Sequence, residues 1–395
     1  MAEDLSPDEQ KTVALITRLA RERFAPRAAQ YDAENRFPDE NYADLREHGL
    51  MGLTVPKPYG GKGLSSLAYS LAIGEMAKGD SSTALTFNMH ATVLTLIDCV
   101  GSPAQKERYF TEVVKRGAIF ASIGSEPNAS PNARTFFIET RLSETTGGYR
   151  INGTKHFCSF GDAADYYFVY AMREGTTRIR EGLLSVVIPH GTPGVEVIET
   201  WNSMAMRATA SHSITFRDGF VRAEDVVGPP GLVFTSGIGT EYALGYSAIY
   251  RSIAEAAFEF ARDYARTRVI KPDTQPIGQS PVIQHHIAEM SVALEASRLL
   301  NMHAAVTPGL GSPERVLAIS QAKYLAAETA IKVTDLALRV CGGRGLMKDY
   351  PLERYYRDVR AGLVMGPSTD FLLSTIGTAE LGLKAPQQKR QDSST

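Results

Sequence analysis

Two runs in the first half of the chain combine hydroxyl, aromatic and glycine residues closely enough to form a binding site. The first is ASIGSEP, residues 121–127, and the second is INGTKHFCSFGDAAD, residues 151–165. A flat, partly apolar ligand with polar edges needs an aromatic contact and a few fixed donors, and hydroxyls supply donors without adding charge. The two runs therefore hold the residue types that such a ligand would need.

The composition excludes several other classes of protein. The chain has 395 residues, 43% hydrophobic and 22% charged, which predicts a globular protein of two or three domains. A net charge of −2 with scattered Lys and Arg disfavours nucleic-acid binding. The three cysteines have no CxxC spacing, so we expect neither disulfides nor a metal site. No apolar run approaches the roughly 18 residues of a membrane span, and we expect a cytoplasmic protein.

The pattern of apolar residues changes along the chain and indicates which elements position these runs. Apolar residues recur at helical intervals over residues 1–119, and short β-rich runs separated by turn residues fill residues 120–232. The helical period returns over residues 233–384, with three or four long helices, and residues 385–395 form a polar, flexible tail. We therefore expect an α+β fold in which an antiparallel β domain separates two helical domains.

With this order of domains, the two runs resemble the signatures of the acyl-CoA dehydrogenase family. The resemblance covers residues 5 to 383 and implies an FAD-dependent oxidoreductase acting on an acyl thioester. It assigns Ile123 and Ser125 to the flavin pyrimidine, Phe157 to the face of the ring and Ser159 to its N5 edge. The run MRATASHSITF, residues 206–216, is similar to the stretch with which the family returns to its helical domain.

The C-terminal part adds further matches to the family. Arg251 and Arg268 match two family arginines, which implies a substrate-binding role for Arg251 and a cofactor pyrophosphate contact for Arg268. Gly342 and Gly343 in CGGRG match the family's glycine turn, where backbone N–H groups can approach phosphate closely. Ser368 is assigned to the cofactor in the same way. The Arg268 and glycine-turn contacts reach a neighbouring subunit's FAD in the family, which implies a homodimer or homotetramer.

The chain also departs from the family pattern. Glu126 to Asn132, EPNASPN, stands where the family commonly has EPGAGSD, and Pro281 and Arg339 replace two glutamines. The family's general base is usually a glutamate in the run EGT, and Gly366 occupies that place here. A minority of the family carries its glutamate beside the first conserved arginine, and that place is Tyr250.

Both known base positions thus lack a carboxylate. Other candidates for the proton acceptor are Tyr250 itself, Asp370 and His90, while Gly366 keeps a backbone N–H for the thioester oxygen.

Three hypotheses remain open. The chain dehydrogenates an acyl thioester, on CoA or a carrier protein, with a displaced base; or it is a flavin monooxygenase; or it is a flavin-holding scaffold without turnover. The electron acceptor is an electron-transfer flavoprotein or oxygen.

Overall fold

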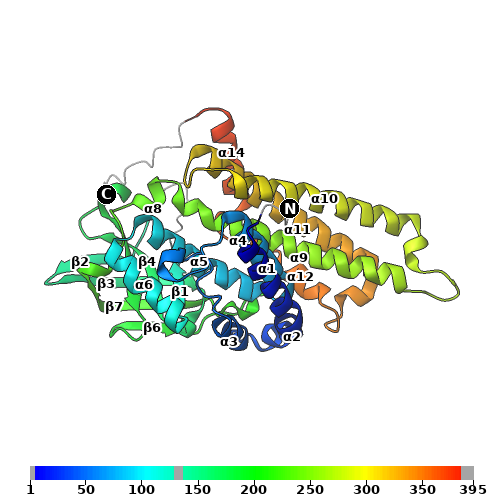
Figure 1. Ribbon diagram of the computed structural model, residues 1–395, viewed down its shortest axis with the longest axis horizontal. Helices are drawn as coiled ribbons and strands as arrows, with labels where there is room; N and C mark the ends of the chain where they lie inside the picture. Colours follow the sequence, from blue (N-terminus) through cyan, green and yellow to red (C-terminus); the bar gives the residue numbers. More distant parts are fainter. Residues whose placement is uncertain (1–4, 129–136, 384–395) are drawn as a thin grey trace.

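The computed structural model describes residues 5–128 and 137–383. Three regions follow one another along the chain (Figure 1): helices, a sheet, and a bundle of long helices that occupies the other half of the molecule. The expected tail at 385–395 and most of the departing run at 126–132 lie outside the described residues.

The first region contains six α-helices, and several of them begin or end at capping residues. Ser6 and Ser102 form capping boxes with Glu9 and Gln105, which satisfies N–H groups that a helix start leaves unpaired. Gly117 ends the last of these helices with φ +67°, a conformation that glycine adopts at little cost. The helices are α1 (Pro7–Leu19), α2 (Ala25–Glu34), α3 (Asp39–Glu47), α4 (Ser66–Gly79), α5 (Ser81–Val100) and α6 (Pro103–Arg116).

Helix α5 differs from expectation in one respect. It is long and apolar enough to cross a membrane by length and composition, although we expected no such segment. However, 72% of its most apolar window is buried inside the protein, as in the core helix of a globular domain.

The middle region is a seven-stranded sheet in the order β1-β4-β2-β3-β7-β6, with β5 paired to β4. We expected antiparallel pairing throughout, but β4 runs parallel to both β1 and β2. Alternating residues indicate that strands exist but not which strands become neighbours, so this mixed pairing could not be read from the pattern. The strands are β1 (Phe120–Ile123), β2 (Arg141–Thr145), β3 (Gly148–Cys158), β4 (Tyr166–Arg173), β5 (Leu183–Pro189), β6 (Val195–Ile198) and β7 (His212–Arg222).

Three long helices dominate the last region, α9 (Glu241–Thr267), α10 (Pro281–Val306) and α11 (Pro313–Cys341), as expected. They lie side by side in Figure 1, and α9 packs against both partners and against α4 and α5. Shorter helices complete the described chain: α7 (Ile179–Gly182), α8 (Leu232–Thr235), α12 (Leu352–Asp358), α13 (Ala361–Val364) and α14 (Thr369–Glu380).

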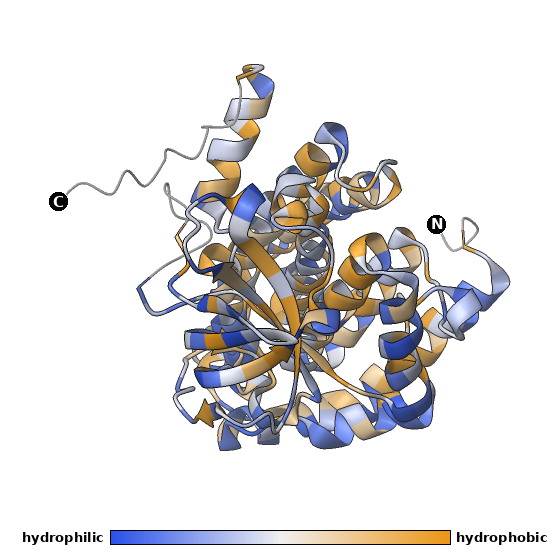
Figure 2. Cartoon of the chain, turned by 90° about the vertical axis from the view of Figure 1, so that its left-hand side faces the viewer, coloured by the Kyte–Doolittle hydropathy of each residue, from blue (hydrophilic) through white to orange (hydrophobic). Residues whose placement is uncertain are grey.

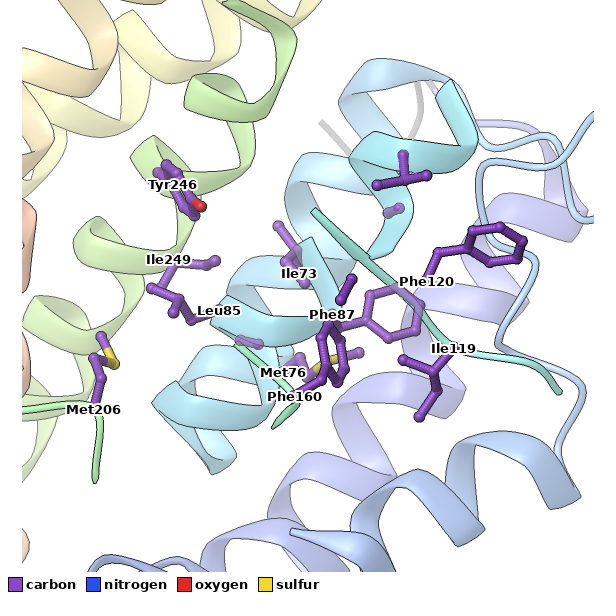
Figure 3. Packing of buried hydrophobic residues seen from close by; sticks show 14 of the residues in the cluster. Ile73, Met76, Leu85, Phe87, Ile119, Phe120, Phe160, Met206, Tyr246 and Ile249 are labelled. Carbon is purple, nitrogen blue, oxygen red and sulfur yellow. The ribbon is translucent and has the colours of Figure 1, made fainter. Parts of the chain in front are cut away.

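One hydrophobic core joins the three regions. In Figure 2 the outer helices alternate between hydrophilic and hydrophobic residues, as expected for helices that bury one face. Figure 3 shows the buried cluster where the regions meet, and its labelled members come from α4, α5, β1, the middle region and α9. They are Ile73, Met76, Leu85, Phe87, Ile119, Phe120, Phe160, Met206, Tyr246 and Ile249. The shared core fixes the regions relative to one another, so a site between them is rigidly held.

Candidate functional site

A cavity of about 1660 Å³ lies where the three regions meet. Its walls come from α5, from the segments after β1 and β3, from residues 200–211, from the start of α9 and from residues 360–367. This volume exceeds the roughly 300–1,000 Å³ of most small-molecule sites, so the cavity has room for a large ligand or for two ligands side by side.

The middle region supplies a wall of hydroxyls and one aromatic ring. Ser125, Phe157 and Ser159 all line the cavity. Phe157 is 63% exposed and has φ +55°, an uncommon conformation for a bulky residue that is found most often at functional sites. Its ring meets Trp201 edge to face at 6.2 Å between ring centres. Ile123 is buried at the end of β1, behind this wall.

The hydroxyls of this wall form a chain. The Ser159 hydroxyl lies 2.8 Å from that of Ser211, which lies 2.7 Å from that of Thr209. Thr209 also donates to the carbonyl of Met206 at 2.9 Å. Because Thr209 gives its hydrogen to the Met206 carbonyl, Ser159 is the end of the chain that can turn its hydrogen toward a polar ligand edge, and it does so without any charge.

A buried ion pair supports the same wall. Lys155 Nζ donates to Glu126 Oε1 at 2.7 Å, and Thr140 Oγ1 donates to the same oxygen at 2.6 Å. Burial alone would raise the pKa of Glu126, but these contacts hold that pKa below its usual value. Glu126 is the one acid among the described residues that line the cavity, so no free carboxylate faces a ligand there.

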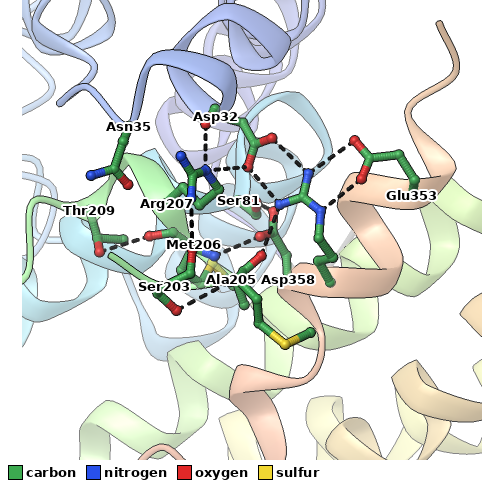
Figure 4. Close-up of polar contacts among 12 residues, drawn as sticks. Asp32, Asn35, Ser81, Ser203, Ala205, Met206, Arg207, Thr209, Glu353 and Asp358 are labelled. Atoms are coloured by element: carbon green, nitrogen blue, oxygen red, sulfur yellow. Dashed lines mark hydrogen bonds and ion pairs between the residues drawn. The ribbon is translucent and has the colours of Figure 1, made fainter. Parts of the chain in front are cut away.

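The segment Trp201–Met206 is tied to two helical regions. The Met206 N–H donates to Asp358 Oδ1 at 2.7 Å, and the Ser81 hydroxyl donates to the other oxygen of Asp358 (Figure 4). Burial raises the pKa of Asp358 to about 6. Beside it, Arg207 donates to the carbonyls of Asp32 and Ser203. The Asp358 carboxyl therefore joins α12, α5 and the cavity wall.

Gly366 lines the opposite wall, together with Met365 and Pro367. This loop rests on Lys323, whose Nζ donates to the carbonyls of Gly362 at 2.6 Å and Pro367 at 2.8 Å. Burial lowers the pKa of Lys323 to about 8. The family resemblance predicts a carboxylate at residue 366. The structure has Gly366 there, on a loop that Lys323 anchors.

The three other base candidates do not line the cavity. Tyr250 is buried beneath the loop, where its hydroxyl contacts Met365 Sδ at 3.4 Å and its burial raises its pKa. Asp370 is exposed in the first turn of α14. His90 is buried, receives the Phe120 N–H at Nδ1 and contacts the Met51 carbonyl through Nε2, both at 3.0 Å. Burial lowers the pKa of His90 to about 4, so it is a neutral side chain that joins α5 to β1.

The expected substrate contact of Arg251 also needs correction. Its side chain is 8% exposed and donates to Glu255 and Ser252, both at 2.9 Å. It points to α4, where the backbone of Gly74 packs against Ser252. The rotation of α9 therefore places Arg251 inside the helical bundle, away from the cavity.

The remaining cofactor candidates lie outside the cavity. Arg268 ends α9, and its buried Nε has no hydrogen-bond partner among the described residues. Gly342 and Gly343 are exposed, and a side-chain carbon on either would meet open space. Ser368 caps α14 by accepting the Phe371 N–H at 3.3 Å.

Comparisons with known proteins agree with this arrangement. Family models described as the N-terminal, middle and C-terminal domains of acyl-CoA dehydrogenase match residues 6–116, 121–219 and 243–381. The chain belongs to the acyl-CoA dehydrogenase family. It is a flavin-dependent enzyme that acts on acyl-CoA, and its cofactor is FAD.

Three similar proteins illustrate the range of this family. A 3-sulfinopropanoyl-CoA desulfinase from Paraburkholderia xenovorans is 33% identical, over 98% of this chain and 99% of the relative. The structure of butyryl-CoA dehydrogenase from Megasphaera elsdenii has a TM-score of 0.89 at 28% identity, over 96% of this chain and 99% of the other. Methanesulfinate monooxygenase from Pseudomonas fluorescens has a TM-score of 0.84 at 27% identity, over 97% and 99%.

The residues of this acyl-CoA dehydrogenase homologue fit FAD. The cavity offers a ring face at Phe157 and neutral hydroxyls along one wall, which suit an isoalloxazine. Outside the cavity, the unpaired Nε of Arg268 and the open backbone at Gly342 suit a phosphate. Both kinds of group are needed, because FAD carries a planar ring at one end and a pyrophosphate further along.

Sequence reasoning missed two tyrosines of the site. Tyr242 and Tyr246 line the cavity, whereas Tyr250, the next tyrosine on the same face of α9, does not. Their spacing of four residues was a usable signal of a shared helix face. The sequence did not show where α9 meets the cavity, and the match to the family pointed to Tyr250, four residues after Tyr246.

Proposed function

We propose that this enzyme oxidises the acyl chain of a thioester without a side-chain carboxylate to take the proton. The observation that carries the proposal is the pairing of a flavin-type wall with a loop in which Gly366 stands where a base is expected. FAD supplies the hydride acceptor when bound. The proton leaves to water in the space that a longer side chain at Gly366 would fill.

The residues have separate roles in this proposal. Phe157 covers the flavin ring, Ile123 and Ser125 hold its pyrimidine edge, and Ser159 faces N5. Arg268, Gly342, Gly343 and Ser368 hold the rest of FAD. The Gly366 N–H, on the loop fastened by Lys323, polarises the thioester carbonyl.

Restoring the carboxylate tests the proposal. We expect Gly366→Glu to speed anaerobic flavin reduction by butyryl-CoA and octanoyl-CoA by about 10²-fold or more, because a positioned base contributes roughly 10²- to 10⁴-fold. Gly366 is not among the glycines with positive φ, so its backbone conformation is open to other residues.

Gly366→Gln is the matched control, since it fills the same space without a base. Equal rates in the Glu and Gln variants would overturn the proposal. Wild-type reduction at the speed of the Glu variant would show that another group already takes the proton. The panel should include 3-sulfinopropanoyl-CoA, the substrate named for one relative.

A second candidate is a flavin monooxygenase. The missing carboxylate at Gly366 also favours this function, and one structural neighbour is a methanesulfinate monooxygenase. Oxygen consumption that requires an added flavin reductase, without anaerobic bleaching by any thioester, would support it. If the protein neither bleaches with a thioester nor consumes oxygen with a reductase, the remaining hypothesis is the flavin-holding scaffold.

We also propose that the chain works as a cytoplasmic homodimer or homotetramer, with acyl-CoA or an acyl-carrier protein as substrate and an electron-transfer flavoprotein or oxygen as acceptor. Helix α10 exposes Val292, Leu299 and Val306 at intervals of seven residues, a stripe that suits a partner helix. A monomer in analytical ultracentrifugation would contradict the oligomer. Electron transfer from the reduced enzyme to added flavoprotein, compared with oxygen, identifies the acceptor.

A further inference from the structure

Two tyrosine hydroxyls on α9 have no hydrogen-bond partner among the described residues, although both residues line the cavity. Tyr246 is only 3% exposed, so its hydroxyl is enclosed by protein and by the cavity. Tyr242 lies one turn earlier on the same face, and the two rings meet edge to face at 5.5 Å between centres. Figure 3 shows the Tyr246 hydroxyl on the side of α9 that faces the N-terminal helices.

The surroundings leave these phenols without a protein acceptor. Helix α5 packs against α9 and presents Leu85, Met89 and Leu96 to the same cavity. The nearby polar groups form hydrogen bonds with other residues: Asn88 Oδ1 accepts the Tyr69 hydroxyl at 2.9 Å, and Thr92 Oγ1 donates to the Asn88 carbonyl at 2.7 Å. Apart from Thr92 and the two phenols, the side chains that α5 and α9 present to the cavity are therefore apolar.

The phenols are neutral donors. Burial raises the pKa of both side chains, that of Tyr242 to about 12. Neither is a proton acceptor at ordinary pH, and neither attracts a charged group as an arginine would. Both hydroxyls face the cavity, and a donor that a ligand buries without a partner costs roughly 1–3 kcal/mol, so an acyl chain without an acceptor binds this slot at a penalty.

The position of the phenols along α9 indicates which part of the acyl chain they meet. Tyr250 contacts Met365, next to Gly366, where the proposed function places the thioester. Tyr246 and Tyr242 follow at one and two turns, about 6 and 12 Å further along the helix. They therefore face the distal part of an acyl chain that starts at Gly366.

We propose that the substrate is an acyl thioester whose distal chain carries a neutral oxygen, a hydroxyl or a carbonyl, that accepts hydrogen bonds from Tyr246 and Tyr242. This inference rests on the proposed function, because it takes the thioester to lie at Gly366. It adds a specificity site that discriminates between chains of equal length by one oxygen atom.

The test is a pair of matched ligands bound to the FAD-loaded enzyme. Isothermal titration calorimetry would compare octanoyl-CoA with hydroxyoctanoyl-CoA isomers that carry the hydroxyl at successive carbons of the distal half. We expect at least one isomer to bind about tenfold more tightly than octanoyl-CoA, which is the gain from satisfying one buried donor. The preferred isomer contacts either Tyr246 or Tyr242. Replacing that tyrosine by Phe should lower the affinity ratio of this isomer to octanoyl-CoA to about one.

Tyr250→Phe is the matched control, because it removes a phenol of the same helix that does not line the cavity. It should keep the preference. A wild-type ratio near one, or a preference that survives in the Tyr242→Phe/Tyr246→Phe double variant, would overturn the inference while leaving the proposed function intact. Failure of every thioester to bind would overturn the proposed function as well.

Discussion

The two walls of the cavity each rest on a buried lysine, and the two lysines are held in different ways. Lys155, behind the middle-region wall, is paired with Glu126 at 2.7 Å. Within residues 5–128 and 137–383, Lys323, behind the Gly366 loop, has only the carbonyls of Gly362 and Pro367 as hydrogen-bond partners. The first wall is locked by an ion pair, whereas the second depends on a lysine whose pKa burial lowers to about 8.

The Lys155 support requires both charges of its ion pair, whereas the Lys323 support does not depend on the charge of the lysine. Removing one partner of a buried ion pair leaves the other charge uncompensated, so the flavin wall tolerates little change. A lysine that donates to carbonyls can lose its charge and still donate two hydrogen bonds. The loop that carries Gly366 can therefore keep its anchor over a wider range of conditions.

The largest effect should come from breaking the ion pair. We expect Lys155→Met to reduce the free energy of unfolding by about 3–5 kcal/mol, because Glu126 stays buried without its cation. Urea denaturation of the FAD-loaded protein measures it. The double variant Lys155→Met/Glu126→Gln should recover a large part of the loss, and a double variant as unstable as the single one would refute the explanation.

The next effect is a pH dependence that comes from the lowered pKa of Lys323. Because the folded-state pKa of Lys323 is about 8 against a usual 10.5, the unfolded chain binds more protons between these values. Stability should therefore rise with pH across this window, by up to roughly 1.4 kcal/mol per unit and roughly 3 kcal/mol in total. The difference in unfolding free energy between wild type and Lys323→Met isolates this contribution. A difference that is flat from pH 8 to 10.5 would contradict the assignment.

A third prediction concerns ligand binding at the Gly366 loop. Lys323→Met frees the Gly362 and Pro367 carbonyls, so the loop loses its anchor and thioester affinity should fall about tenfold, the equivalent of one ordinary hydrogen bond. Lys332→Met is the control, since this exposed lysine of the same helix pairs with Glu289. Equal dissociation constants for the thioester in both variants would show that Lys323 does not position the loop.

The last prediction compares two cofactor contacts, and its Ser125 arm has the smallest expected effect. Arg268→Ala should weaken FAD retention by about 1.5–3 kcal/mol, since a charge-assisted contact to a pyrophosphate is lost. Ser125→Ala should cost about 0.5–1.5 kcal/mol, the range for a neutral hydroxyl. FAD dissociation constants measure both, and equal values would place Arg268 away from the pyrophosphate.

Part of the site could be predicted from the sequence because it is carried by short runs. Ser125, Phe157 and Ser159 lie within segments whose residue types match a flavin wall, and all three line the cavity. Gly366 was located by its place in a run near the C-terminus, and it lines the cavity as well. In these cases neighbouring residues along the chain are also neighbours in space.

The errors concern residues whose role depends on how distant elements pack. His90 was a candidate proton acceptor, but its Nδ1 accepts the Phe120 N–H of β1 and its Nε2 contacts the Met51 carbonyl. Arg251 and Tyr250 lie on α9, whose start at Glu241 and rotation against α4 decide which side chains reach the cavity. The order of the domains and the absence of a carboxylate at residues 250 and 366 were determined by the sequence alone. The tertiary structure decided which phenols face the ligand, because a helix exposes one face to a cavity only after its neighbours have covered the others.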